Sequence, residues 1–135
     1  MLASEVMVKD PHVAVAGAMA SEVAIMFRAR NISVVPVVDD HRTRRFLGTL
    51  SDRDIVTRCV ASARHPMHTR ADELMRTNSP VIRPDQELDG YELRLDQDPT
   101  DSHLRATITV VDDEHRVVGF ISHPEQVSGV SITWA

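Results

Sequence analysis

The sequence has little of what marks secreted, membrane-bound or nucleic-acid-binding proteins. Cys59 is its one cysteine, so no disulfide can form within the chain. No apolar run approaches the roughly 18 residues of a membrane span, and no basic segment leads into an apolar signal core at residues 1–6. We therefore expect a cytoplasmic protein without a membrane partner.

Two further absences narrow the possible functions. With 15 Lys and Arg against 20 Asp and Glu, the formal net charge is −5 and the basic residues are scattered. Binding to nucleic-acid phosphates needs clustered cations, so we expect no nucleic-acid partner. The sequence also lacks a Gly-x-Ser-x-Gly elbow, a His-Glu-x-x-His pair and a phosphate loop ending in Gly-Lys-Ser. We predict that the protein is not an enzyme and requires no cofactor.

What the sequence does contain is an internal repeat. Residues 34–38 read Val-Val-Pro-Val-Val, and residues 46–54 read Phe-Leu-Gly-Thr-Leu-Ser-Asp-Arg-Asp. About seventy residues later, residues 108–113 and 117–122 repeat the same pattern. Each copy predicts two short β-branched strands joined by a charged turn, with Gly-x-x-Ser at the corner before a helix. The chain is therefore predicted to be a duplication.

The remaining elements follow from periodicity and from helix breakers. In the first half the pattern predicts a short helix at 3–8, a strand at 12–15 and amphipathic helices at 17–30 and 52–63. Cys59 falls on the apolar face of the last of these, so we expect it to be buried and unreactive. In the second half Gly90 and the Asp-Pro-Thr-Asp run at 98–101 interrupt the long helix, so a loop or distorted helix is expected there.

This order of elements, with Val-Pro-Val-Val-Asp at 35–39 and Gly-Thr-Leu-Ser-Asp-Arg-Asp at 48–54, resembles a tandem pair of CBS domains. The resemblance covers nearly the whole chain, and the linker region is similar to small stand-alone bacterial CBS-pair proteins, including the hypoxic-response type. It implies an α/β (α+β) fold of two β-α-β-β-α repeats packed about a pseudo-twofold axis. Residues 1–64 would form the first CBS domain and 65–135 the second. In many members the two inter-repeat clefts bind adenosine compounds, and modules pair into dimers.

The resemblance also implies a set of contact residues. In the family pattern Gly-x-x-Ser/Thr-x-x-Asp the aspartate accepts hydrogen bonds from ribose hydroxyls and the serine contacts phosphate. An ionised carboxylate offers two acceptor oxygens, which suits a cis-diol. Arg53 would supply a cation, and the adenine would lie against apolar strand residues. The predicted contact residues are Val13, Val15, Val35, Pro36, Gly48, Ser51, Arg53 and Asp54.

The residue types allow other interpretations of the same positions. Ser51 and Asp54 also fit a capping box at the start of a helix, and both roles can coexist. The predicted strand residues fit an ordinary apolar core. In the second copy Glu125 stands where the pattern has aspartate, and Pro124 removes one N–H. The sequence therefore predicts that the cleft served by Ser51 and Asp54 is the occupied one.

The leading prediction for function is a regulatory or sensor module that binds an adenosine-containing ligand, such as AMP, ADP, ATP or S-adenosylmethionine. It would pass ligand occupancy to an unidentified effector protein or through a homodimer, which exposed apolar side chains such as Met19, Met26 and Val60 predict. One alternative is a ligand-free dimeric interaction scaffold. Another is a metal sensor, since His65 and His68 have a spacing that could hold a metal ion on a helix.

Overall fold

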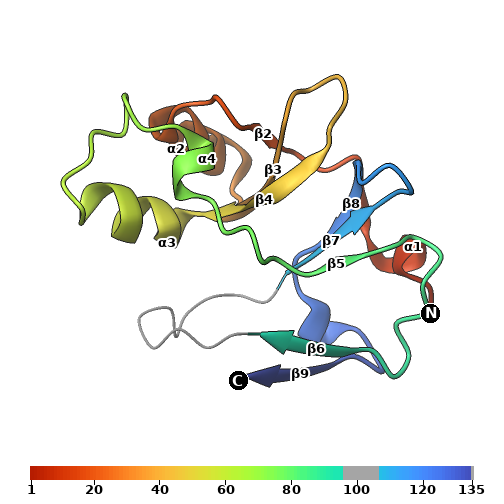
Figure 1. The fold of residues 1–135 in the computed structure, drawn as a ribbon. Helices are drawn as coiled ribbons and strands as arrows, with labels where there is room; N and C mark the ends of the chain where they lie inside the picture. The colour runs from red at the N-terminus through yellow and green to blue at the C-terminus, as the bar shows by residue number, and fades with distance from the viewer. Residues whose placement is uncertain (96–106, 135) are drawn as a thin grey trace.

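Two β-sheets carry the two repeats, and the computed structural model describes residues 1–95 and 107–134 (Figure 1). The first half contains α1 (Ala3–Val6), β1 (Val8–Lys9), β2 (Ala14–Val15), α2 (Ala20–Arg30), β3 (Val34–Val38), β4 (Phe46–Ser51), α3 (Asp52–Asp54) and the π-helical segment η1 (Ile55–Val60). The second half contains α4 (Ala71–Leu74), β5 (Val81–Ile82), β6 (Glu92–Leu95), β7 (Ile108–Val111), β8 (Val117–Ile121), the 3-10 turn η3 (Pro124–Gln126) and β9 (Ser131–Trp134).

The first sheet has the strand order β2-β3-β4 and is covered by helices on one face (Figure 1). Strand β3 pairs in parallel with β2 and antiparallel with β4, as expected for β-branched runs on either side of a charged turn. Val23 and Phe27 of α2 pack with Leu50 of β4 and with Cys59 of η1. The predicted burial of Cys59 is confirmed, because its side chain is completely enclosed. Helix α2 ends at Asn31, whose φ of 53° is a left-handed helix end.

The second sheet has the order β1-β8-β7-β5, so a strand from the start of the chain completes the sheet of the second half. Val8 pairs with Phe120, and Ala3 of α1 lies in the core of the second half. In the opposite direction, the linker after α4 pairs with the sheet of the first half. The Thr49 N–H donates to the Arg76 carbonyl (2.9 Å) and the Arg76 N–H to the Thr49 carbonyl (2.8 Å). Each repeat thus lends an extended segment to the other repeat's sheet.

Glycines allow both of these crossings. A Cβ added to Gly48 would lie 2.3 Å from the Arg76 carbonyl oxygen, and one added to Gly119 would lie 2.2 Å from the Met7 Sδ. Both distances are far below van der Waals contact, so a side chain at Gly48 would force the crossing backbone away and one at Gly119 would displace the Met7 side chain. The glycine in each copy of the repeated motif is therefore explained by a close approach of the other repeat.

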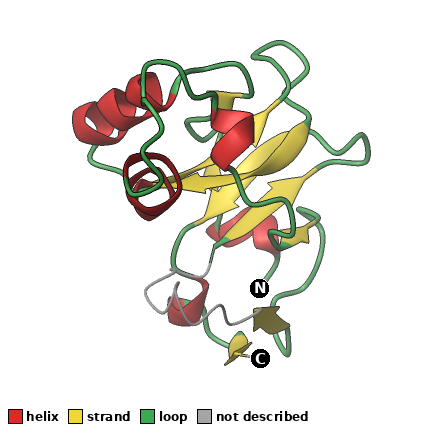
Figure 2. Cartoon of the chain, turned by 60° about the vertical axis from the view of Figure 1, so that its left-hand side comes forward, coloured by secondary structure: helices red, strands yellow, loops and turns green. Residues whose placement is uncertain are grey.

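The two sheets meet about a pseudo-twofold axis, as predicted. The Phe46 N–H donates to the His115 carbonyl (2.9 Å), and the Val117 N–H donates to the Arg44 carbonyl (2.8 Å). An apolar cluster between the sheets contains members of both halves, namely Val13, Val38, Phe46, Val111 and Val117. Figure 2 shows most strands gathered side by side, with two strands apart from them near the C-terminus. The predicted α/β fold of two packed repeats is confirmed.

The second repeat departs from the first after β5. Where the first repeat has α2, the described residues that follow β5 form a turn and then β6, which pairs in parallel with β9 as a separate 2-stranded sheet. Gly90, with a φ of +79°, lies in the turn before β6, which agrees with the predicted interruption of the helix. Residues 98–101 of that prediction lie outside the described residues. None of the helices within residues 1–95 and 107–134 has the length and apolar character that would let it cross a membrane.

Candidate functional site

The corner between β4 and α3 holds Asp54, the aspartate of the Gly-x-x-Ser-x-x-Asp pattern. Ser51 is the N-cap of α3, and its Oγ accepts a hydrogen bond from the Asp54 N–H (3.1 Å). Oδ2 of Asp54 accepts one in return from the Ser51 N–H (3.0 Å). This is the capping box that the sequence predicted, and it holds the carboxylate inside the protein with only 2% of the side chain exposed.

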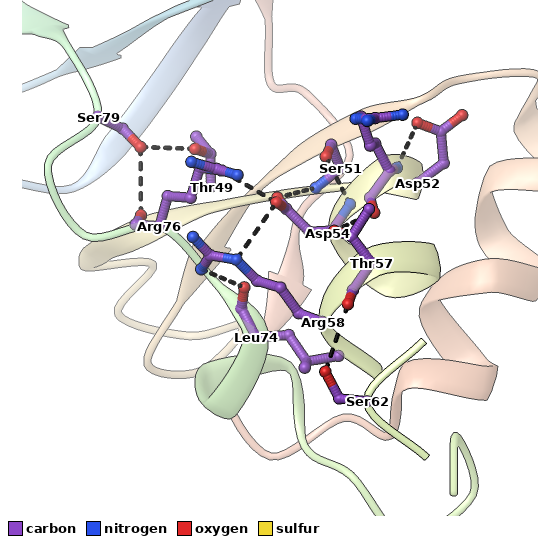
Figure 3. A network of polar contacts seen from close by, with 11 residues as sticks. Thr49, Ser51, Asp52, Asp54, Thr57, Arg58, Ser62, Leu74, Arg76 and Ser79 are labelled. Carbon is purple, nitrogen blue, oxygen red and sulfur yellow. Dashed lines mark hydrogen bonds and ion pairs between the residues drawn. The ribbon is translucent and has the colours of Figure 1, made fainter. Parts of the chain in front are cut away.

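Two arginines approach the other carboxylate oxygen of Asp54. Nε of Arg76, which follows α4, donates to Oδ1 at 2.9 Å, while Nε of Arg58 in η1 lies 3.8 Å from the same atom. Figure 3 shows both side chains directed at Asp54 from different elements. We call Ser51, Asp54, Arg58 and Arg76 the Asp54 corner. Both oxygens of its buried carboxylate have a partner, as a buried charge requires.

Neighbouring hydroxyls fix the position of Arg76. Thr49 Oγ1 and Ser79 Oγ lie 2.5 Å apart, and Ser79 Oγ also donates to the Arg76 carbonyl at 3.2 Å (Figure 3). Together with the backbone pairing of Thr49 and Arg76, these bonds hold the linker against β4. The guanidinium of Arg76 is therefore delivered to Asp54 by a fixed backbone and is only 16% exposed.

The structure places the other predicted contact residues in several different surroundings. Val35 lies in the core beneath α2, and Val13 lies in the cluster between the sheets, with Val15 packed against it. Pro36 is buried on β3 opposite Thr49, Gly48 lies under the Arg76 crossing, and Arg53 is partly buried in the first turn of α3. The apolar-core interpretation of Val13 and Val35 thus describes their packing. The role of the whole predicted set in ligand binding stays a prediction.

A cleft of about 820 Å³ opens between the two repeats at a different place. We call it the open cleft; its lining consists of residues 8–12 and 31–34, Asp52, Phe120, Ser122 and His123. One wall comes from the first half, where β1 leads into β2 and where α2 leads into β3. The other wall comes from the end of β8. None of the predicted contact residues, all of which are in the described part of the chain, lines this cleft.

The chemistry of the open cleft is mixed. Ile32, Val34 and Phe120 offer apolar surface, with Phe120 itself mostly buried. Lys9, His12 and His123 are exposed and carry a positive charge or ring N–H donors, while Asp10 and Asp52 supply carboxylates. A volume within the usual range for small-molecule pockets and an apolar wall with a few polar groups fit a flat ring that carries polar substituents.

The sequence predicted a second, unoccupied cleft at the later copy, whose Gly-x-x-Ser pattern ends at Ser122, but it did not reveal the lining residues of the other half. His12 and Ile32 lie outside the repeated motif, and Phe120 belongs to the copy that departs further from the family pattern. The pairing of β1 with β8 brings them together. A strand signal at Val8–Lys9 would have been the clue, but two residues are too few for periodicity to reveal.

The histidines of the connector lie against each other. The rings of His65 and His68 are 4.8 Å apart between centroids, and His65 Nδ1 accepts a hydrogen bond from the Met67 N–H. In the part of the chain that the structure describes, no group of three or more His, Cys, Asp or Glu side chains is placed to hold a metal ion. The pair therefore has no third ligand among the described residues.

The first repeat matches a known protein family. Residues 3–61 match the family model of the CBS domain. This part of the chain is similar to a CBS domain. CBS domains are regulatory modules, and the match spans the first repeat up to the end of η1. No curated protein sequence matches the chain.

Solved structures with a similar fold cover most of the chain. Hypoxic Response Protein I with two coordinated zinc ions has a TM-score of 0.70 at 21% identity, covering 90% of this chain and 92% of that one. The CBS domain pair of protein MJ0100, in complex with 5′-methylthioadenosine and S-adenosyl-L-methionine, has a TM-score of 0.66 at 23% identity, with coverages of 90% and 89%. CBSX2 in complex with AMP has a TM-score of 0.65 at 18% identity, with coverages of 90% and 89%. At these identities the likeness shows the fold, which is that of a CBS-domain pair.

Proposed function

We propose that the protein is a cytoplasmic regulatory module that binds an adenosine-containing ligand, such as AMP, ADP, ATP or S-adenosylmethionine, in the open cleft. The observation that carries this proposal is the cleft itself, which lies between the repeats and combines an apolar wall with cationic and acidic side chains. Two structural neighbours hold adenosine compounds, AMP in one and S-adenosyl-L-methionine with 5′-methylthioadenosine in the other.

The lining suggests how such a ligand would lie. The adenine ring would pack against Ile32, Val34 and Phe120, because a flat apolar face suits these side chains. A phosphate would lie toward Lys9 and His12, since a charged ammonium makes the stronger kind of hydrogen bond to a phosphate oxygen.

A thermal-shift panel of AMP, ADP, ATP, S-adenosylmethionine and zinc tests the function. A ligand present at one hundred times its dissociation constant adds about 2.7 kcal/mol to the free energy of unfolding, so binding gives a clear rise in Tm. We expect at least one adenosine compound to do so. A panel without any rise would support the ligand-free scaffold, and a rise with zinc alone would support the metal sensor.

A double variant, Lys9→Ala with His12→Ala, tests the place of binding. Both side chains are exposed, so the fold should be kept. We expect the affinity for AMP to fall by about tenfold, equivalent to about 1.4 kcal/mol, while the affinity for adenosine changes little. His41→Ala, an exposed histidine outside the cleft lining, is the matched control. Unchanged AMP affinity in the double variant would show that AMP binds outside the open cleft.

We further propose that the module acts as a homodimer and signals to an effector protein through it. Helix α2 and segment η1 expose Ile25, Val56 and Val60 by more than half, which is apolar surface that a partner copy would cover. Of the residues named from the sequence, Val60 is in this set, whereas Met26 packs on the first core. Sedimentation of the wild type against Val56→Glu with Val60→Glu is the test. We expect a dimer that becomes a monomer in the variant.

A further inference from the structure

Residues 1–9, which contain α1 and β1 and which we call the N-terminal arm, pack on the second half of the molecule. The chain nevertheless continues from the arm into the first sheet (Figure 1). Ala3 is fully buried in the second core, and its N–H donates to the Gln86 carbonyl (2.9 Å). Val8 pairs with Phe120 of β8. The arm therefore docks on one repeat while it is connected to the other.

The hinge between the arm and the first sheet holds a strained residue. Asp10 has a φ of 48°, in the left-handed region that a residue with a Cβ enters at a cost. Pro11 follows directly, and a proline pushes the residue before it toward extended conformations. Residues 10–12 alone join β1 to Val13, which is buried between the sheets. An extended hinge would relieve the strain, but it would carry the arm away from its own second half.

We propose that two copies of this chain exchange their N-terminal arms, so that each arm docks on the second half of the other copy. Exchange restores the contacts of the arm, because the docking surface is the same in both copies. It also releases the strain at Asp10, since the hinge no longer has to turn the chain back. Short hinges under strain favour exchange of this kind. The partner of the arm is therefore a second copy of this chain.

Arm exchange makes the open cleft a shared site. Val8 and Lys9 belong to the arm, and both line the cleft together with Phe120 of the second half. In the exchanged dimer, these two arm residues of one copy stand beside Phe120 and residues 31–34 of the other. Each cleft is then completed by the partner copy, so anything that binds there is coupled to the pairing of the copies. This contact differs from the dimer proposed through α2 and η1, because it does not involve those elements.

A disulfide between the arm and the second half reports where the arm docks. Leu2 and Glu87 are directly opposed in an antiparallel bridge, and the Cβ atoms of such residues lie close enough for a disulfide. Leu2→Cys and Glu87→Cys in one dilute chain should give an intrachain disulfide, which shows that the pair can form. When the two substitutions are on different chains that are mixed and incubated, the same disulfide forms only through an arm docked on the other copy. Cys59 is fully buried, so it stays outside the reaction.

The mixed chains are oxidised at about 0.5 mM, which approaches the millimolar effective concentration of a tethered segment. We expect a disulfide-linked dimer whose yield rises with concentration and exceeds that of Leu2→Cys mixed with His41→Cys, the control for random contact. Asp10→Gly in both chains should raise the dimer dissociation constant by at least about tenfold, because glycine adopts a left-handed φ without this cost. Ala63→Gly relaxes another left-handed residue, with a φ of 58°, outside the hinge and should change nothing. A yield no higher than random contact, or one equal in Asp10→Gly and Ala63→Gly, would overturn the proposal.

Sedimentation gives a second readout that keeps the test decisive if the cysteine variants do not fold. Val56→Glu with Val60→Glu removes the dimer proposed through α2 and η1, so this variant is a monomer in dilute solution. At about 0.5 mM we expect arm exchange to restore a dimer, which Asp10→Gly should abolish. A monomer at that concentration before Asp10→Gly is added would contradict exchange. Both measurements are made without nucleotide, so a failure of the proposed ligand binding appears in the thermal-shift panel and not in them.

Discussion

The corners after β4 and β8 begin with similar sequences and differ in what reaches them from the other repeat. At the first, a capping box and Arg76 satisfy both oxygens of Asp54. At the second, Ser122 follows β8, η3 has no side-chain cap, and the crossing residue Val8 leaves a cleft open. The state of each corner is therefore set by a residue that its own motif does not contain. A motif repeated within one chain need not mark two equal sites.

The largest expected difference between the corners is in stability. Asp54→Ala removes the carboxylate half of the capping box and leaves Arg76 without its carboxylate, and breaking a largely buried ion pair in this way costs about 3 kcal/mol of the free energy of unfolding. Glu125→Ala makes the matched change in the second copy, where η3 has no side-chain cap to lose, and should cost less than about 1 kcal/mol. Urea unfolding of both variants provides the measurement. Equal losses would remove the contrast between the corners.

Alanine in place of Gly48 and of Gly119 should destabilise the protein to different degrees. In Gly48→Ala the new Cβ meets the backbone carbonyl of Arg76, which cannot move without breaking the pairing with Thr49. We expect a loss of about 2–3 kcal/mol, at the upper end for overpacking. In Gly119→Ala the nearest atom is the Sδ of Met7, at the flexible end of a side chain, so a loss of about 1 kcal/mol is expected. Thermal unfolding of both variants is the measurement. A larger loss of stability in Gly119→Ala than in Gly48→Ala would contradict this expectation.

Labelling of Cys59 reports on the first repeat alone, since it is the one thiol of the chain and is fully buried in that core. In native buffer we expect slow reaction with a thiol reagent and a marked increase in denaturant. Asp54→Ala should accelerate native labelling because α3, which precedes η1, loses the carboxylate bonds to Ser51 and Arg76, whereas Glu125→Ala should leave the rate unchanged. Fast labelling of the wild type would show that the first core opens far more readily than its packing indicates.

The smallest expected effect concerns the hairpin turns. A hydrogen bond from the Thr43 hydroxyl is the main cause that lowers the pKa of Asp39, and the Thr43 N–H does the same for the pKa of Asp40. Burial raises the pKa of Asp112, but hydrogen bonds from Arg116 and the Glu114 N–H outweigh it and lower the pKa overall. Since folded pKa values below the unfolded ones stabilise above about pH 4, this stability is lost as pH falls through the folded values.

Asp40→Asn and Asp112→Asn compare the two turns directly. Each variant should be slightly less stable than the wild type at pH 7, and the difference should be smaller at pH 3 because the wild-type carboxylates begin to take up protons below about pH 4. Urea midpoints at the two pH values give the answer. A difference that grows as the solution becomes more acidic would contradict the lowered pKa values.

The local part of the structure could be predicted from the sequence, and the contacts between repeats could not. Strand β3, helix α2, the capping box of Ser51 and the burial of Cys59 follow from periodicity and from residue types near one another in the chain. The Arg76–Asp54 pair joins residues 22 positions apart, which no local pattern signals. The pairing of β6 with β9 was missed for the same reason, because the partner strand lies far along the chain.

The exchange of crossing segments also constrains how the chain reaches its fold. Val8 finds its partner at Phe120, so the first strand cannot pair until most of the chain has left the ribosome. The first core can form earlier, since its members up to Leu74 come from the first part of the chain. Contacts of such long sequence separation slow folding and join the halves into one cooperative unit. The N-terminal segment therefore stays without its partner strand until β8 has been synthesised.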